Sequence, residues 1–70
     1  MPYDTNEALP APVQAHLPAH AQDIYRVAFN HAWDRYRVDA IAHRVAWAAV
    51  KRRYVKANRD WVEKPRAELR

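Results

Sequence analysis

The fold is decided by residues 17–36, which read LPAHAQDIYRVAFNHAWDRY. Apolar side chains recur in this stretch at steps of three and four residues, the spacing that places them on one face of an α-helix. Proline at position 18 suits the start of a helix, because its missing N–H costs nothing there. We therefore expect a helix from about residue 18 to residue 36, with an apolar face made of Ala21, Ile24, Tyr25, Ala28, Phe29, Ala32 and Tyr36.

A second amphipathic stretch follows a break at Val38 and Asp39, where the Asp39 carboxylate can accept from the free amides that begin a helix. The spacing predicts a helix over residues 40–57, ended by Asn58 in the left-handed conformation. Apolar residues form two stripes on this helix. We expect the preceding long helix to cover one stripe and a short N-terminal helix to cover part of the other. The stripes are His43, Ala46, Trp47, Val50, Tyr54 and Ala57, and Ile41, Val45, Ala48 and Val55.

Four prolines punctuate residues 1–18 and permit a short helix over about residues 10–16. The predicted fold class is mainly α: a compact domain of one short and two long helices over residues 1–64, followed by a flexible tail at 65–70. We expect residues 2–4 to pair with residues 61–63 in a minimal two-stranded β ribbon. The expected core consists of Tyr25, Phe29, Ala32, His43, Trp47, Val50, Tyr54 and Trp61.

Composition excludes several kinds of functional site from this 70-residue chain. It has no cysteine and no glycine, which removes thiolate chemistry and the glycine-rich loops that hold phosphates. His16 and His20 have the spacing of two metal ligands on one helix, but Pro18 lies between them and breaks that geometry. We expect no enzyme activity, no metal and no cofactor. Apolar runs are too short for a membrane span, and the expectation is a cytoplasmic monomer.

Charge is distributed unevenly along the chain, whose formal net charge is +4. All but one of the 12 lysines and arginines lie in residues 35–70. A basic surface on the third helix has three interpretations: a solvated face, a protein-docking face, or a face that grips nucleic-acid phosphates. A docking face would take Val45 and Val55 as its apolar centre. The basic residues assigned to this partner-binding or nucleic-acid-binding face are Arg44, Lys51, Arg52, Lys56 and Arg59, with Arg53 adding to the positive surface.

Two sequence blocks resemble the signature of the ChaB family. Residues 17–33 contain LPAHAQDIY and AFNHAW, and residues 43–61 contain HRVAWAAVK followed by Tyr54, Lys56 and Trp61. The resemblance implies three helices with a tiny sheet, and a role as a cation transport regulator associated with a sodium–calcium/proton antiporter. The implied partner is a protein, such as the cytoplasmic face of a transporter. Viral relatives of the family imply the alternative, a nucleic-acid-binding accessory protein.

One feature departs from the family pattern. Some members carry an acid-rich insert between the second and third helices, whereas this chain has only residues 35–40, with Asp39 as their single carboxylate. Calcium takes six to eight oxygen ligands, largely from carboxylates. The sequence therefore predicts no cation site in this connection.

Overall fold

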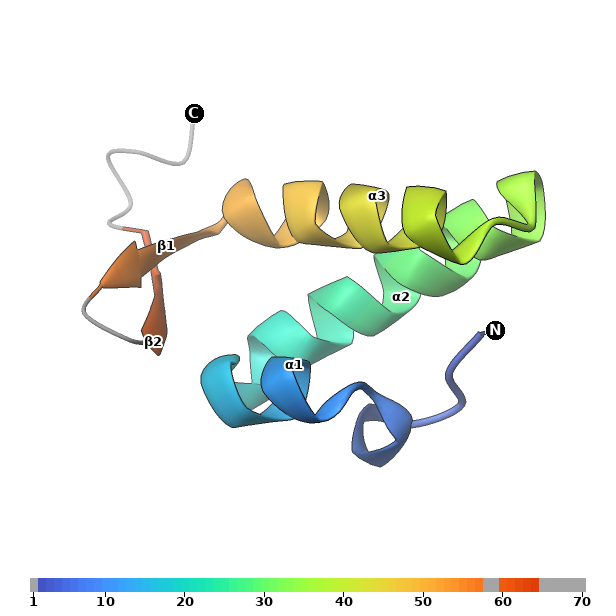
Figure 1. Cartoon of the computed structure of the whole chain (residues 1–70). Coiled ribbons are helices and arrows are strands. Elements are labelled where there is room, and N and C mark those ends of the chain that lie inside the picture. The colour runs from blue at the N-terminus through green and yellow to red at the C-terminus, as the bar shows by residue number, and fades with distance from the viewer. Residues whose placement is uncertain (1, 58–59, 65–70) are drawn as a thin grey trace.

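The computed structural model describes residues 2–57 and 60–64 (Figure 1). It confirms the mainly helical class, with one short and two long helices and a two-stranded ribbon. The two long helices pack against each other, and the ribbon follows the end of the last helix. The elements in chain order are the 3-10 helix η1 (Asn6–Ala8), α1 (Ala11–His16), α2 (Ala19–Tyr36), α3 (Asp39–Lys51), β1 (Tyr54–Ala57) and β2 (Asp60–Glu63).

The connection between α2 and α3 is a tight two-residue turn. Arg37 closes α2 in the left-handed conformation, with φ at 58°, and its N–H donates to the Trp33 carbonyl at 2.7 Å. This conformation favours glycine, and the chain has none. The Arg37 guanidinium lies 4.9 Å from the centre of the Trp33 ring, a cation–π contact that holds the arginine in place.

The core lies between α2 and α3 and is closed on one side by the N-terminal segment. Small side chains on α3 let the two helices approach closely, and Tyr25 fills the centre of the contact with no exposed surface. Leu9, Val13 and Leu17 cover this contact from the segment around α1. The buried hydrophobic residues are Leu9, Val13, Leu17, Ala21, Tyr25, Phe29, Ala32, Ala42, Ala46, Val50 and Tyr54.

The N-terminal arm is attached to α2, so the prediction that residues 2–4 form part of the ribbon is wrong. The Tyr3 N–H donates to Asn30 Oδ1 at 2.8 Å, and Asn30 Nδ2 donates back to the Tyr3 carbonyl at 2.7 Å. The Tyr3 ring lies 4.8 Å from that of Phe29. The Asn30 side chain thus offers the arm the pair of bonds that a neighbouring strand would offer.

The ribbon forms within the C-terminal segment, where β1 pairs antiparallel with β2. The predicted third helix is therefore too long, since α3 ends at Lys51 rather than at residue 57. Tyr54 and Val55 are an aromatic and a β-branched residue, which favour a strand, and strand alternation buries Tyr54 while leaving Val55 exposed. Tyr54 occupies a core position whether it belongs to a longer helix or to a strand. Helical spacing alone therefore could not distinguish the two structures.

The predicted second stripe on α3 is not covered by α1. Val45 remains 40% exposed, Ala48 is exposed, and Val55 has left the helix for β1. The predicted cap at Asn58 and the predicted tail at residues 65–70 lie outside the described residues.

Candidate functional site

The basic residues singled out from the sequence lie on different elements of the fold. Arg44, Lys51 and Arg52 are exposed on or directly after α3, and Lys56 is exposed on β1. Lys51 and Lys56 line the same hollow, which includes neither Arg44 nor Arg52. Arg59 lies outside the described residues. The structure therefore brings together two of the predicted cations.

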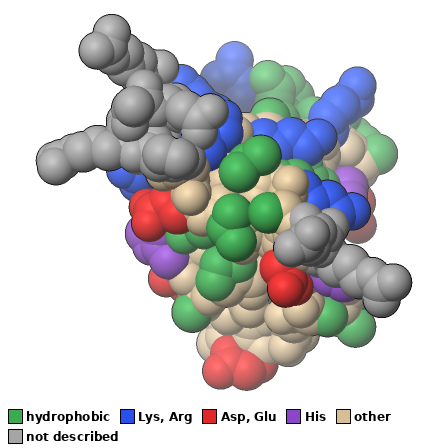
Figure 2. All heavy atoms as spheres, turned by 90° about the vertical axis from the view of Figure 1, so that its left-hand side faces the viewer, with side chains coloured by type: hydrophobic (Ala, Val, Ile, Leu, Met, Phe, Trp, Pro, Cys, Tyr) green, Lys and Arg blue, Asp and Glu red, His purple; other side chains and the backbone are tan. Residues whose placement is uncertain are grey.

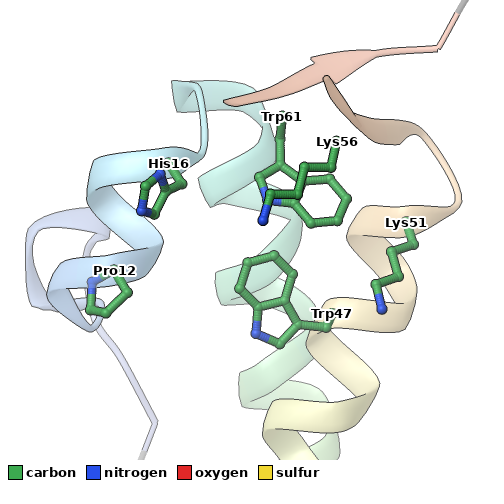
Figure 3. A pocket seen from close by; sticks show the side chains of 6 residues that line it. All are labelled: Pro12, His16, Trp47, Lys51, Lys56 and Trp61. Atoms are coloured by element: carbon green, nitrogen blue, oxygen red, sulfur yellow. The ribbon is translucent and has the colours of Figure 1, made fainter. Parts of the chain in front are cut away.

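That hollow, which we call the tryptophan–lysine pocket, has a volume of about 400 Å³ (Figure 3). Four elements contribute to it: α1 forms one wall, and the end of α3 with the two strands forms the other. Lys56 and Trp61 are direct partners in the ribbon register, which places both on its inner face. The lining residues are Pro12, His16, Trp47, Lys51, Lys56 and Trp61.

The two indoles in the pocket pack against each other and against the core. Their ring centroids are 5.4 Å apart with an angle of 38° between the planes, and both side chains are half-buried. Trp47 also meets the Tyr25 ring edge-on at 5.5 Å. The indoles are thereby fixed as a wall of the pocket, with part of each ring open to solvent.

His43 differs from its predicted place in the core, because its side chain is exposed at the edge of the α2–α3 contact. It still bonds to two aromatic residues. Trp47 Nε1 donates to His43 Nε2 at 2.9 Å, and His43 Nδ1 lies 2.5 Å from the Tyr25 hydroxyl. An indole N–H only donates, so Nε2 is the bare nitrogen. The proton of the neutral ring is then on Nδ1, which donates to the Tyr25 oxygen.

Burial has a clear electrostatic effect on Tyr25. Desolvation of the phenol, with a smaller contribution from nearby Tyr3, raises the pKa of Tyr25 to about 12. Tyr54 responds in the same direction, because burial and then the facing Glu63 carboxylate raise its pKa, against an opposing effect of Arg53. Both hydroxyls therefore stay neutral over the physiological range.

The outer face of the ribbon carries an exposed apolar pair. Val55 and Val62 are partners in the register and are 43% and 44% exposed. Arg52 and Arg53 precede β1 and are exposed beside it. The face at this end of the molecule has hydrophobic side chains gathered across its middle and lysine and arginine side chains above them (Figure 2). Val55, predicted as part of a docking centre with Val45, thus has Val62 rather than Val45 as its exposed partner in the structure.

The described part of the chain has neither a cluster of metal ligands nor a membrane-spanning helix. No three side chains among histidine, aspartate and glutamate there are grouped as metal ligands. Within residues 2–57 and 60–64, no helix combines the length and apolarity that crossing a bilayer requires.

Sequence reasoning found the members of the tryptophan–lysine pocket but not the pocket. The sequence places Pro12 and His16 in the short helix over residues 10–16, Trp47 and Trp61 in the core, and the lysines on an outer face. One signal was present: Lys56 and Trp61 sit symmetrically about residues 58–59, a spacing that a short hairpin converts into a cross-strand pair.

Known proteins are similar to this chain in sequence and in fold. The sequence model of the ChaB family matches residues 9–64. The "Putative cation transport regulator ChaB" of Escherichia coli K12 is 52% identical over 75 residues, covering 91% of this chain and 99% of the relative. The protein of that name from Shigella flexneri gives the same values.

A solved structure of a ChaB protein is also similar to this chain in its fold. The solution structure titled "NMR solution structure of the putative cation transport regulator ChaB" is 49% identical and superimposes with a TM-score of 0.80, over 91% of this chain and all of that one. Sequence and overall fold agree with ChaB proteins along nearly the whole chain, and the chain therefore belongs to the ChaB family.

Proposed function

We propose that this protein is a non-enzymatic regulator of cation transport that acts by docking onto a partner protein. The relatives bear the name of cation transport regulators, which supports the regulatory role. The partner that fits this role is the cytoplasmic face of a cation antiporter, of the sodium–calcium/proton type associated with the family. Among the described residues that line the tryptophan–lysine pocket, none carries a hydroxyl, thiol or carboxylate, which favours binding over catalysis.

The observation that carries the docking proposal is the exposed Val55–Val62 pair. Cross-strand valines on a solvated ribbon face leave apolar surface in water, and its removal on binding is favourable at about 25 cal/mol per Å². Arg52 and Arg53, which precede Val55 in the chain, are also exposed. The surface that complements it has an apolar centre and a rim of carboxylates, because opposite charge at the rim speeds association and fixes orientation.

The test is a binding measurement against a purified antiporter in lipid nanodiscs. We replace Val55 and Val62 by threonine, which keeps the branched shape that a strand favours and exchanges methyl for hydroxyl. Losing two buried methyls should weaken binding about tenfold, since each methyl contributes about 0.8 kcal/mol. Val27→Thr is the matched control, because Val27 is an exposed valine that belongs to α2 and not to the ribbon.

Equal loss in the control, or no loss in the ribbon variant, would reject this docking face.

A second function, nucleic-acid binding by the basic residues, is favoured by one observation: Lys51 and Lys56 have no ion pair within the described residues. It predicts oligonucleotide binding that weakens steeply between about 50 and 200 mM salt. Replacing Arg52 and Lys56 by alanine would flatten that salt slope by up to about two units, one for each phosphate contact removed. Such behaviour without antiporter binding would select this second function.

A further inference from the structure

We infer that the tryptophan–lysine pocket binds a mononucleotide, with the planar base against the indoles and the phosphate between Lys51 and Lys56. This site is distinct from the proposed docking face. Lys56 and Trp61 point from the inner side of the ribbon into the pocket, whereas Val55 and Val62 occupy its outer side. Failure of one proposal therefore leaves the other standing.

The lysines supply the reason for an anionic ligand. Lys51 ends α3 and Lys56 lies in β1, and both side chains reach the same 400 Å³ hollow. No carboxylate is among its lining residues, and neither ammonium is paired with one in the described part of the chain. Lysine commonly holds phosphate as a point charge. Two lysines from different elements, which line one hollow and have no carboxylate partner within the described residues, thus form a receptor for a group with more than one negative charge.

The aromatic wall supplies the reason for a planar ring. Trp47 and Trp61 are held by each other and by the core, and each is half-buried. The N–H of Trp47 is already bonded to His43, so the ring offers its apolar surface to a ligand. Pro12 and His16 of α1 form the facing wall (Figure 3). Stacking of a base on an aromatic side chain is sequence-tolerant, because every base has a π-face.

The volume of the pocket and the charge next to it determine the class of the ligand and its orientation. The pocket volume lies near the lower end of the range of about 300–1,000 Å³ for small-molecule sites, which admits one base with its sugar and phosphate. A smaller hollow of about 260 Å³ adjoins it, shares His16 and Trp61, and includes Asp60. The Asp60 carboxylate disfavours a phosphate there, so the anionic end belongs at the lysines.

The experiment titrates the whole chain with adenosine monophosphate, adenosine and inorganic phosphate by calorimetry, and follows the indole N–H signals by NMR. We expect adenosine monophosphate to bind more tightly than either fragment and to shift the signals of Trp47 and Trp61. Lys51→Gln and Lys56→Gln should each weaken this binding about tenfold, as for loss of one charge-assisted hydrogen bond. Lys64→Gln is the matched control, because Lys64 does not line the pocket, and it should change binding less than twofold.

Three outcomes would overturn the inference. Equal affinity for phosphate and adenosine monophosphate would show an anion site without a base contact. Equal weakening by Lys64→Gln would show attraction by net charge alone. Binding of short single-stranded oligonucleotides with none of adenosine monophosphate would assign the surface to nucleic acid rather than to a small molecule. Trp61→Leu adds a further check, since it should reduce the affinity for adenosine monophosphate to that for phosphate.

Discussion

His43 joins the buried centre of the protein to its surface through its two ring nitrogens. Nδ1 meets the hydroxyl of Tyr25, which has no exposed surface, and Nε2 accepts from the half-buried Trp47. The tyrosine oxygen depends on this contact, because a buried polar group without a partner costs about 1–3 kcal/mol. The indole N–H lies nearer to water and can exchange partners. The cost of losing His43 is therefore concentrated on Tyr25.

Replacing His43 by phenylalanine should lower the free energy of unfolding by about 1–3 kcal/mol, because the Tyr25 hydroxyl loses its partner. Adding Tyr25→Phe should restore much of that loss, since no buried polar group then remains unsatisfied. Urea unfolding of both single variants and the double variant measures this coupling. Losses that simply add would show that the hydroxyl and the imidazole do not depend on each other.

The elements show which parts of the fold the sequence specifies. Helix α2 was predicted closely because its apolar residues keep helical spacing from Ala21 to Ala32 and Pro18 marks its start. The end of α3 was not predicted closely. Tyr54 fits a helical stripe and a strand equally well, and no glycine or proline marks the end of the helix. Pairing between β1 and β2 decided the outcome, and such pairing leaves little trace in one-dimensional spacing.

The candidate site was less predictable than the helices for a related reason. Each lining residue of the tryptophan–lysine pocket has an ordinary explanation within its own element. Their convergence depends on the angle of α1 and on the ribbon register, both of which are set by tertiary contacts. The N-terminal arm is a similar case, because the two hydrogen bonds between Tyr3 and Asn30 join residues 27 positions apart.

The turn between α2 and α3 gives a prediction about the replacement of Arg37. Arg37→Val should lower the free energy of unfolding by at least about 1 kcal/mol, because a β-branched residue is strongly disfavoured at positive φ. Arg37→Gly relieves the backbone and also loses the contact with Trp33, so it should be the milder change. Thermal unfolding of the two variants ranks them. A glycine variant less stable than the valine variant would contradict the claim that the positive φ at this position determines the loss.

Burial raises the pKa of three tyrosines, which predicts that the whole molecule loses stability at alkaline pH. The pKa of Tyr25 rises from an ordinary 10.0 to about 12, and burial also raises the pKa values of Tyr3 and Tyr54. The unfolded chain therefore ionises first and releases protons that the folded chain keeps. By linkage, the contribution of these tyrosines to stability is complete below pH 10.0 and is lost as pH rises toward about 12.

The measurement is the urea midpoint over this pH range, with tyrosinate absorbance recorded in parallel. Tyr25→Phe should make the alkaline loss shallower, because its phenol has the largest shift. Lysine ionisation is common to both proteins and cancels in the comparison. An unchanged pH profile in Tyr25→Phe would contradict the assignment of the loss to this residue.

The Tyr3–Asn30 contact also makes one backbone amide a reporter of slow opening. Tyr3 precedes every helix and strand, yet its N–H is bonded to a side chain of α2, so exchange with deuterium requires the arm to detach. We expect the Tyr3 amide to exchange much more slowly than those of Asp4 and Thr5, at a rate set by local opening. Asn30→Asp keeps the acceptor but loses the donor to the Tyr3 carbonyl, and should bring Tyr3 close to the rate of its neighbours.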